Sequence, residues 1–222
     1  MGHREALLEG AKQCLIEKGY ARTTARDIVA ASGTNLASIG YHYGSKEALL
    51  NEALLQANAE WGEALEKALA EGPDRQAAAH ERLEAFWTKV IGLFAGHRRL
   101  WAVNFEAVTR IEHAPEVRIA FAKALEEAWA GLGETLLAHL GEDTGQEKDA
   151  YTVRAVGSLS HALLTGLMAQ WLIDPENAPG GPELSLALRA VAGAAVPYPA
   201  GLEKGARPPQ SPHHGGSQRP PG

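Results

Sequence analysis

The sequence predicts an all-α protein, in which a small N-terminal helix-turn-helix unit precedes a larger helical domain. Helix-favouring Ala, Leu and Glu dominate the 222 residues, and long alternating runs of β-branched residues do not occur. Near the N-terminus, two short helical patterns flank a tight turn that contains glycine, which is typical of a helix-turn-helix. Longer apolar patterns with helical spacing follow, separated by Gly, Pro and polar residues.

Composition and charge exclude several classes of protein. With 45% hydrophobic and 22% charged residues, the chain can bury a core in one or two domains. The formal net charge of -6 argues against indiscriminate nucleic-acid binding. A single cysteine forms no internal disulfide, which fits a reducing compartment. We find no secretory signal and no apolar run near the ~20 residues that cross a bilayer, so we expect a cytoplasmic protein without a membrane partner.

Local residues support both helices of the helix-turn-helix, predicted at Ala25–Ser32 and Leu36–Tyr43. Thr24 and Asp27 have the spacing of a capping box at the start of the first helix. Gly33 follows that helix, where the chain often needs a positive φ. The second helix of such a motif lies in the DNA major groove, so the stretch predicts a DNA-binding regulator.

The second of these helices divides into two faces. Leu36, Ile39 and Tyr43 share one face by their spacing, and we expect them to pack inward. The opposite face is small or hydrogen-bonding and can approach base edges closely; its residues are Ala37, Ser38, Tyr41 and His42. In the helix before the motif, Cys14 shares a face with Leu7 and is expected to be a buried small residue.

The stretch resembles the N-terminal pattern of TetR-type transcriptional regulators, in which "TT..DIA..AGV" is followed by "Y.HF.SKE.L". The matching residues are Thr23, Thr24, Asp27, Ile28, Ala31, Gly33, Tyr41, His42, Tyr43, Ser45, Lys46, Glu47 and Leu49. The resemblance is specific over roughly the first quarter of the chain. The remainder agrees with the family in length and helical character.

The resemblance implies a double-stranded DNA operator as partner and assigns contacts to individual residues. The residues that it implies contact phosphates are Thr24, Tyr41, His42 and Lys46. Those that it places near base edges are Arg26, Ala37, Ser38 and Gly40. Many members carry tyrosine where this chain has Gly40, so one usual backbone contact is in question. Arg26 is the best base reader by chemistry, because a guanidinium pairs bidentately with guanine O6 and N7.

Each of these assignments has a structural alternative. Tyr43 fits a core position, Tyr41 a merely exposed one, and His42 a cap of the following turn. Lys46 fits a solvated lysine at a helix start, although a cation there opposes the helix dipole and a phosphate would explain it better. Residues 1–55 carry six basic and six acidic groups, so DNA affinity must come from a local basic patch doubled by dimerisation.

Gly, Pro and polar residues that typically end helices divide the remaining chain into six predicted helices. They are expected at residues 45–71, from 74 or 75 to 96, 98–112, 115–140, 148–173 and 182–196. Domain boundaries follow as 1–50 for the DNA-binding unit and 51–196 for the helical effector-binding and dimerisation domain. Residues 197–222 are rich in Pro and Gly and read as a disordered tail, in which the adjacent His213 and His214 lack the fixed geometry of a metal site.

The helix predicted at 148–173 is apolar around much of its circumference, which indicates packing on several sides. Small residues such as Gly157 and Gly166 allow close helix approach. Together with the apolar helix at 182–196, it predicts a surface that self-associates. TetR-type proteins use their last two long helices for a four-helix dimer interface, so the resemblance implies a homodimer here.

The resemblance also implies a small-molecule effector, bound among the middle helices, that releases DNA. A hydrophobic or aromatic effector fits the residues available to line a cavity. The candidate effector-binding residues are Trp87, Trp101, Asn104, Phe105, His161, Thr165 and Met168. Glu106 is a further candidate polar group. The alternative is that these residues form ordinary core.

Other functional classes find less support in the sequence. HExxH, CxxC, GxSxG and P-loop patterns are not found, so we expect no enzyme, metal site or cofactor. The sequence leaves open a helical protein-interaction module whose head has lost DNA binding, which Gly40 and the neutral head would fit. The preferred hypothesis is a sequence-specific transcriptional repressor that leaves a palindromic operator when its effector binds.

Overall fold

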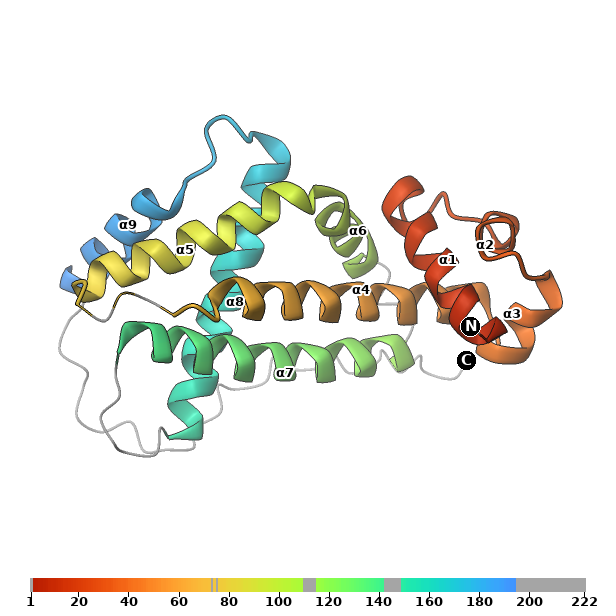
Figure 1. Cartoon of the computed structure of the whole chain (residues 1–222), viewed down its shortest axis with the longest axis horizontal. Helices are drawn as coiled ribbons and strands as arrows, with labels where there is room; N and C mark the ends of the chain where they lie inside the picture. The colour runs from red at the N-terminus through yellow and green to blue at the C-terminus, as the bar shows by residue number, and fades with distance from the viewer. Residues whose placement is uncertain (1, 73, 75, 110–114, 142–148, 195–222) are drawn as a thin grey trace, which may run out of the picture.

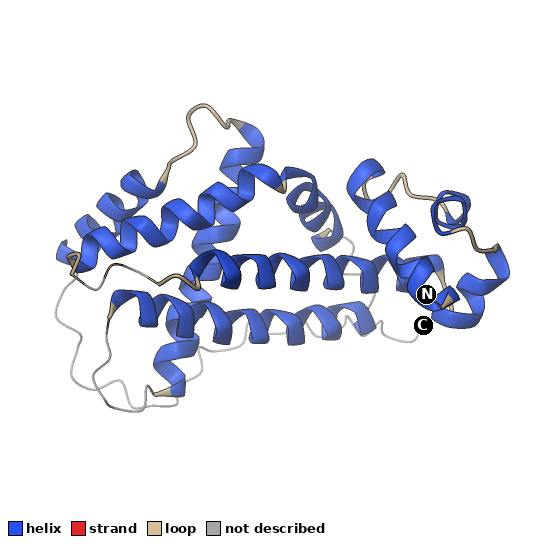
Figure 2. Cartoon of the chain, in the orientation of Figure 1, coloured by secondary structure: helices blue, strands red, loops and turns tan. Residues whose placement is uncertain are grey.

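The computed structural model describes residues 2–72, 74, 76–109, 115–141 and 149–194, and within these ranges every regular element is an α-helix (Figure 2). This confirms the predicted fold class. In chain order the helices are α1 (His3–Lys18), α2 (Ala25–Ser32), α3 (Leu36–Tyr43), α4 (Lys46–Leu69), α5 (Ala79–Gly96), α6 (Arg98–Val108), α7 (Pro115–Leu140), α8 (Ala150–Ile173) and α9 (Gly181–Ala194). The tail at 197–222, with His213 and His214, lies outside the described residues.

Helices α1–α3, which we call the head, cluster at one end of the molecule (Figure 1). Helix α4 starts in the head and runs through the rest, which we call the body, with α7 alongside it. Helix α5 packs against α9, and α7 packs against α8. The long α4 therefore joins the head to the centre of the body.

The helix predicted to open at residue 74 or 75 begins only at Ala79, and hydrogen bonding explains the difference. The Asp74 carboxylate accepts from the Gln76 amide at 2.9 Å, and the Asp74 carbonyl accepts from the Ala77 amide at 3.1 Å. These bonds form a turn in place of a helical one. Helix α5 starts after Ala78, whose amide donates to the Glu81 carboxylate at 2.8 Å.

The other boundaries differ from prediction by smaller amounts. Helix α4 ends at Leu69 and α6 at Val108, where residues 45–71 and 98–112 had been predicted. Residues 110–112, 148, 195 and 196 of the predicted helices lie outside the described residues. Ser45 precedes α4 as its N-cap, and its hydroxyl accepts the Ala48 amide at 3.0 Å.

The head has a continuous apolar core. Leu7, Ile28 and Leu49 are fully buried and come from α1, α2 and α4. Cys14 is buried beside them, which confirms the prediction, and burial raises the pKa of its thiol. Thr23 is also buried, and its hydroxyl donates to the Gly19 carbonyl at 2.7 Å.

Aromatic side chains form the centre of the body. Trp61 on α4 stacks on Phe94 of α5 and meets Trp101 of α6 edge-on, with ring centroids 5.7 and 4.7 Å apart. Phe86 and Trp87 on α5 are almost completely buried and pack edge-on at 5.4 Å. These contacts join α4, α5 and α6 into one unit.

Helices α7 and α8 approach each other closely at two glycines. A Cβ at Gly157 would lie 1.7 Å from the Trp129 carbonyl oxygen, and one at Gly133 would lie 2.1 Å from the Val153 carbonyl oxygen. The predicted close approach along this helix is thus confirmed at Gly157, whereas Gly166 faces open space. Contrary to expectation, α8 is long and apolar enough to span a bilayer, by length and composition alone.

Candidate nucleic-acid interface

The helix-turn-helix is held by short-range hydrogen bonds that its own residues supply. The Thr24 hydroxyl accepts the Asp27 amide at 3.2 Å, and the Asp27 carboxylate accepts the Thr24 amide at 2.9 Å, which completes the predicted capping box. Gly33 adopts the left-handed conformation at φ 65° that ends α2. The Asn35 side chain then caps α3 by accepting the Ser38 amide at 3.1 Å.

An ion pair fixes the start of α2 to the end of α1. Lys18 Nζ lies 2.5 Å from Asp27 Oδ1. This hydrogen bond, followed by those from Thr24, holds the pKa of the Asp27 carboxyl well below its ordinary value. Asp27 is therefore committed to the fold of the head, and it leaves the neighbouring Arg26 as the outward charge of α2.

Most of the predicted DNA contacts lie on the surface of the head. The exposed ones are Thr24, Arg26, Ala37, Gly40 and Tyr41. Tyr41 is 86% exposed, and its ring meets the half-buried His42 edge-on at 4.8 Å. Arg26 is exposed and makes no hydrogen bond or ion pair with any residue that the structure describes, so its guanidinium is available to a ligand.

Lys46 has protein partners that the sequence did not indicate. Its Nζ donates to the Thr23 carbonyl at 3.2 Å and lies 3.3 Å from the Glu47 carboxylate. These contacts account for a cation at the start of α4, which the helix dipole alone would disfavour. A phosphate contact through Lys46 remains a prediction.

Two residues of α3 lie differently from the expected division of its faces. Leu36, expected to pack inward with Ile39, is 53% exposed, whereas Ile39 is 4% exposed. Ser38, expected near base edges, is 9% exposed and so has little side-chain surface for a base. Tyr43 is half-buried, and its hydroxyl donates to the Arg4 carbonyl at 2.6 Å.

Ion pairs neutralise much of the charge in the head. Arg4 pairs with Glu52 at 2.6 Å, and Lys12 pairs with Glu60 at 2.5 Å, both between α1 and α4. Arg26 is left without such a partner among the described residues. A formally neutral head therefore still presents positive charge at its surface, at Arg26 on α2.

The predicted effector residues come from three helices of the body. Trp101, Asn104 and Phe105 lie on α6, and α6 contacts α8, which carries His161, Thr165 and Met168. Trp87 on α5 is 1% exposed. Most of the seven already have partners in the fold.

Three polar residues of this set illustrate the interactions that its members make within the fold. The Asn104 side chain exchanges hydrogen bonds with the Asn58 side chain at 2.8 and 2.9 Å. The Thr165 hydroxyl donates to the His161 carbonyl at 2.9 Å. Burial lowers the pKa of the His161 imidazole, so this ring favours its neutral form.

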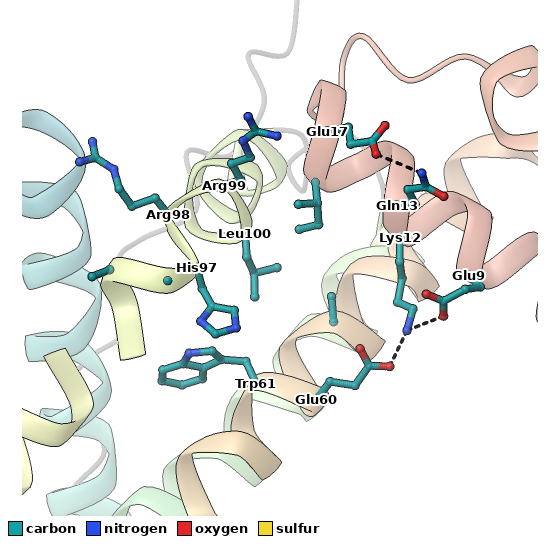
Figure 3. Close-up of a pocket in the computed structure, with 14 residues that line it drawn as sticks. Glu9, Lys12, Gln13, Glu17, Glu60, Trp61, His97, Arg98, Arg99 and Leu100 are labelled. Carbon is teal, nitrogen blue, oxygen red and sulfur yellow. Dashed lines mark hydrogen bonds and ion pairs between the residues drawn. The ribbon is translucent and has the colours of Figure 1, made fainter. Parts of the chain in front are cut away.

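A cleft of about 630 Å³ opens elsewhere, where α1, α4 and the corner between α5 and α6 meet (Figure 3). Trp61 and His97 lie together on one side of it, and the Lys12–Glu60 pair lies on the other. None of the seven predicted effector residues lines this cleft. Its walls belong to both head and body, so we call it the junction cleft.

Sequence reasoning missed the role of Glu106. Expected as a polar group of the effector cavity, it instead faces the head, where its carboxylate accepts the amides of Tyr20 and Ala21 at 2.9 and 2.7 Å. The partners are more than eighty residues away in the chain, and a single glutamate on a helix gives no signal of such a contact. The described residues contain no group of three His, Cys, Asp or Glu placed to hold a metal ion.

Two family descriptions match this chain. Residues 7–53 match "Bacterial regulatory proteins, tetR family", and residues 79–195 match "BetI-type transcriptional repressor, C-terminal". The first match covers the helix-turn-helix, and the second covers most of the body. The second alone extends over more than half of the chain.

Individual relatives agree with this assignment. The HTH-type transcriptional repressor AcnR of Corynebacterium efficiens is 41% identical over 46 residues, which are 21% of this chain and 24% of AcnR. The chain thus spans about a quarter of the length of the curated relatives it matches.

Solved structures share the fold over nearly the whole length. A putative transcriptional regulator from Pseudomonas aeruginosa PAO1 is 27% identical, with a TM-score of 0.57 over 86% of this chain and 89% of that one. A putative regulator from Saccharomonospora viridis in complex with choline is 23% identical, with a TM-score of 0.58 over 86% and 95%. With the family matches and the helix-turn-helix geometry, these findings establish that the chain belongs to the TetR family of transcriptional regulators.

Proposed function

We propose that this protein is a homodimeric repressor that binds a palindromic double-stranded DNA operator and is released from it by a small hydrophobic effector. The observation that carries the proposal is the exposed surface of the helix-turn-helix, which includes Arg26 on α2 and Ala37, Gly40 and Tyr41 on α3. The matched body family and the AcnR relatives are named repressors, which supports repression over activation.

The proposed DNA contacts follow the exposed residues of the head. Thr24, Tyr41, His42 and Lys46 hold phosphates, and Arg26 reads a base through its guanidinium. Ala37 and Gly40 let α3 approach the base edges, because neither has a bulky side chain. We leave Ser38 out of the base-reading set, since its side chain is buried.

Dimerisation is supported by apolar surface on the last two helices. Of nine large hydrophobic side chains exposed in the described residues, five lie on α8 and α9: Tyr151, Leu159, Ile173, Leu186 and Val191. Such a concentration on a soluble domain typically marks an interface. A second copy of the chain would cover it and place two heads on one face of the DNA.

The effector part of the proposal rests on the aromatic body. We place the effector between α6 and α8, among the predicted residues, with Trp87 behind them. The head contacts α6 through Glu106, so a ligand that displaces α6 would act on the head. The Saccharomonospora relative is described with choline, which supplies a first probe.

Operator binding is tested by selecting sequences from random duplexes with the purified protein, then titrating the selected duplex at several salt concentrations. We expect a palindrome, bound by two protomers, with affinity that falls steeply with salt. A failure to retain any duplex at low salt would instead support the interaction module without DNA binding.

Release is tested with the same duplex by fluorescence anisotropy. The probes are choline and 3,3-dimethyl-1-butanol, which has the same shape without the charge, so that the two separate charge recognition from apolar fit. His161→Leu alters the proposed body site, and Gln13→Ala alters the junction cleft. We expect release to change in the first variant only; a change confined to the second would place the effector in the cleft.

A further inference from the structure

Helix α3 presents the two large apolar side chains that are exposed in the described part of the head. Leu36, its first residue, is 53% exposed, and Tyr41 is 86% exposed. An exposed leucine is ordinary on its own. This one occupies the N-terminal end of the helix whose N-terminal residues approach base edges in a helix-turn-helix.

One side of α3, beginning at Leu36, carries no hydrogen-bonding side chain. Leu36, Ala37 and Gly40 lie within one side of α3 by helical spacing, and all three are exposed. A Cβ at Gly40 would have no atom within 4 Å, so nothing from the protein stands over this surface. Ser38, the hydroxyl residue of the same turn, is buried. The side of α3 that Leu36, Ala37 and Gly40 form is therefore apolar.

One group in the major groove matches such a surface. The 5-methyl of thymine is the apolar feature by which base pairs differ there, while every other distinguishing group is a hydrogen-bond donor or acceptor. The positive end of the α3 dipole, together with an exposed Arg26 on α2 that makes no ion pair with the described residues, favours negatively charged DNA as the occupant of the helix-turn-helix surface.

We infer that Leu36 is a specificity-determining residue, which packs against the 5-methyl group of a thymine in each half-site, with Ala37 beside it. The inference rests on the proposed function. On this inference, α3 recognises bases through apolar contacts, and Arg26 recognises them through hydrogen bonds. It also explains how a helix without polar base-reading side chains retains sequence preference.

The test uses the selected operator with each thymine replaced in turn by deoxyuridine, which keeps base pairing and removes only the methyl. Burial of one methyl corresponds to about a four-fold change in affinity. We expect wild type to lose about that factor at one or two positions in each half-site. Leu36→Ala should bind the unmodified operator more weakly and show no further loss at those positions. Ile119→Ala, which removes an apolar side chain on α7 that is more exposed than Leu36, should behave as wild type.

The outcomes separate the inference from the function on which it rests. If wild type selects an operator but tolerates deoxyuridine everywhere, or if Leu36→Ala keeps the full deoxyuridine penalty, the inference is overturned and the repressor function stands. If no duplex is selected at low salt, the proposed function fails and the inference with it.

Discussion

The carboxylate of Glu106 accepts the backbone amide of Tyr20 at 2.9 Å, which joins α6 of the body to the turn between α1 and α2. Its second oxygen accepts the amide of Ala21 at 2.7 Å. Gly19 makes room for this contact, because a Cβ there would lie 3.1 Å from the carboxylate. Two backbone amides in the turn after α1 thus donate their hydrogen bonds to a side chain of the body.

Glu106→Ala should therefore loosen the head. Hydrogen bonds to a charged group contribute about 1.5–3 kcal/mol each, but the half-buried carboxylate is partly screened, so we expect a total loss of about 1–3 kcal/mol in the free energy of unfolding. Glu106→Gln, which keeps one acceptor oxygen, should lose less. Urea unfolding measures the series, with the exposed Glu66→Ala as control. Equal stability of all variants would contradict a structural role for this contact.

Acid should weaken the head through Asp27. Its hydrogen bonds with Lys18 and Thr24 lower the folded-state pKa, so the unfolded chain takes up a proton first as the pH falls. The stability that these bonds supply is complete above about pH 4 and is lost below it, toward the folded-state pKa. Unfolding at pH 7, 4 and 2.5 should show Asp27→Asn losing less stability across this range than wild type. Parallel curves would exclude the mechanism.

Gly157→Ala should destabilise the body strongly. The new Cβ would fall 1.7 Å from a backbone oxygen of Trp129, and neither helix can move without disturbing the packing of α7 on α8. Overpacking of this kind costs about 1–3 kcal/mol or more. Gly92→Ala is the matched control on α5, where a Cβ meets nothing and helix propensity improves by up to about 1 kcal/mol. Thermal unfolding should move the two variants in opposite directions.

Helix boundaries that depend on neighbouring residues in the chain could be predicted from the sequence. The limits of α2 and α3 agree with prediction because Thr24, Gly33 and Asn35 act on their immediate neighbours in the chain. Asp74 shows the limit of such reasoning. Its side chain accepts the Gln76 amide two residues on, and this bond competes with the helix that Asp74 or Arg75 was expected to open.

Features that depend on contacts between distant parts of the chain could not be predicted from the sequence. Helix α3 has only about two turns, so spacing does not fix which side packs on α1, and Leu36 was assigned inward although half of it is exposed. Glu106 has its partners 85 and 86 residues away. The junction cleft also joins residues of α1, α4 and α6 that no motif connects.

Dimerisation through α8 and α9 should be broken by a buried charge. Leu159→Glu and Val191→Glu each replace a side chain that is more than half exposed in one protomer and would lie in the interface. We expect monomers by sedimentation and a large loss of operator affinity, since each half-site would bind alone. Ile119→Glu introduces the same charge on α7, where Ile119 is 69% exposed, and should leave the dimer intact. Dimeric Leu159→Glu and Val191→Glu proteins would move the interface elsewhere.

Arg26 and Lys46 should respond differently to operator sequence and to salt. Arg26→Ala removes the proposed base contact, so it should cost about 1–3 kcal/mol at one base pair and relax the sequence preference there, with little change on random DNA. Lys46→Gln removes the proposed phosphate contact, so it should weaken binding to both kinds of DNA. It should also reduce the salt slope, the dependence of the logarithm of affinity on the logarithm of salt concentration, by about one per protomer. Because Lys46 also holds the Thr23 carbonyl, unfolding of the free variant must be measured alongside. If the variant has a reduced salt slope and an unchanged free energy of unfolding, Lys46 contacts a phosphate. If the free energy of unfolding falls and the slope is unchanged, Lys46 serves only the fold of the head.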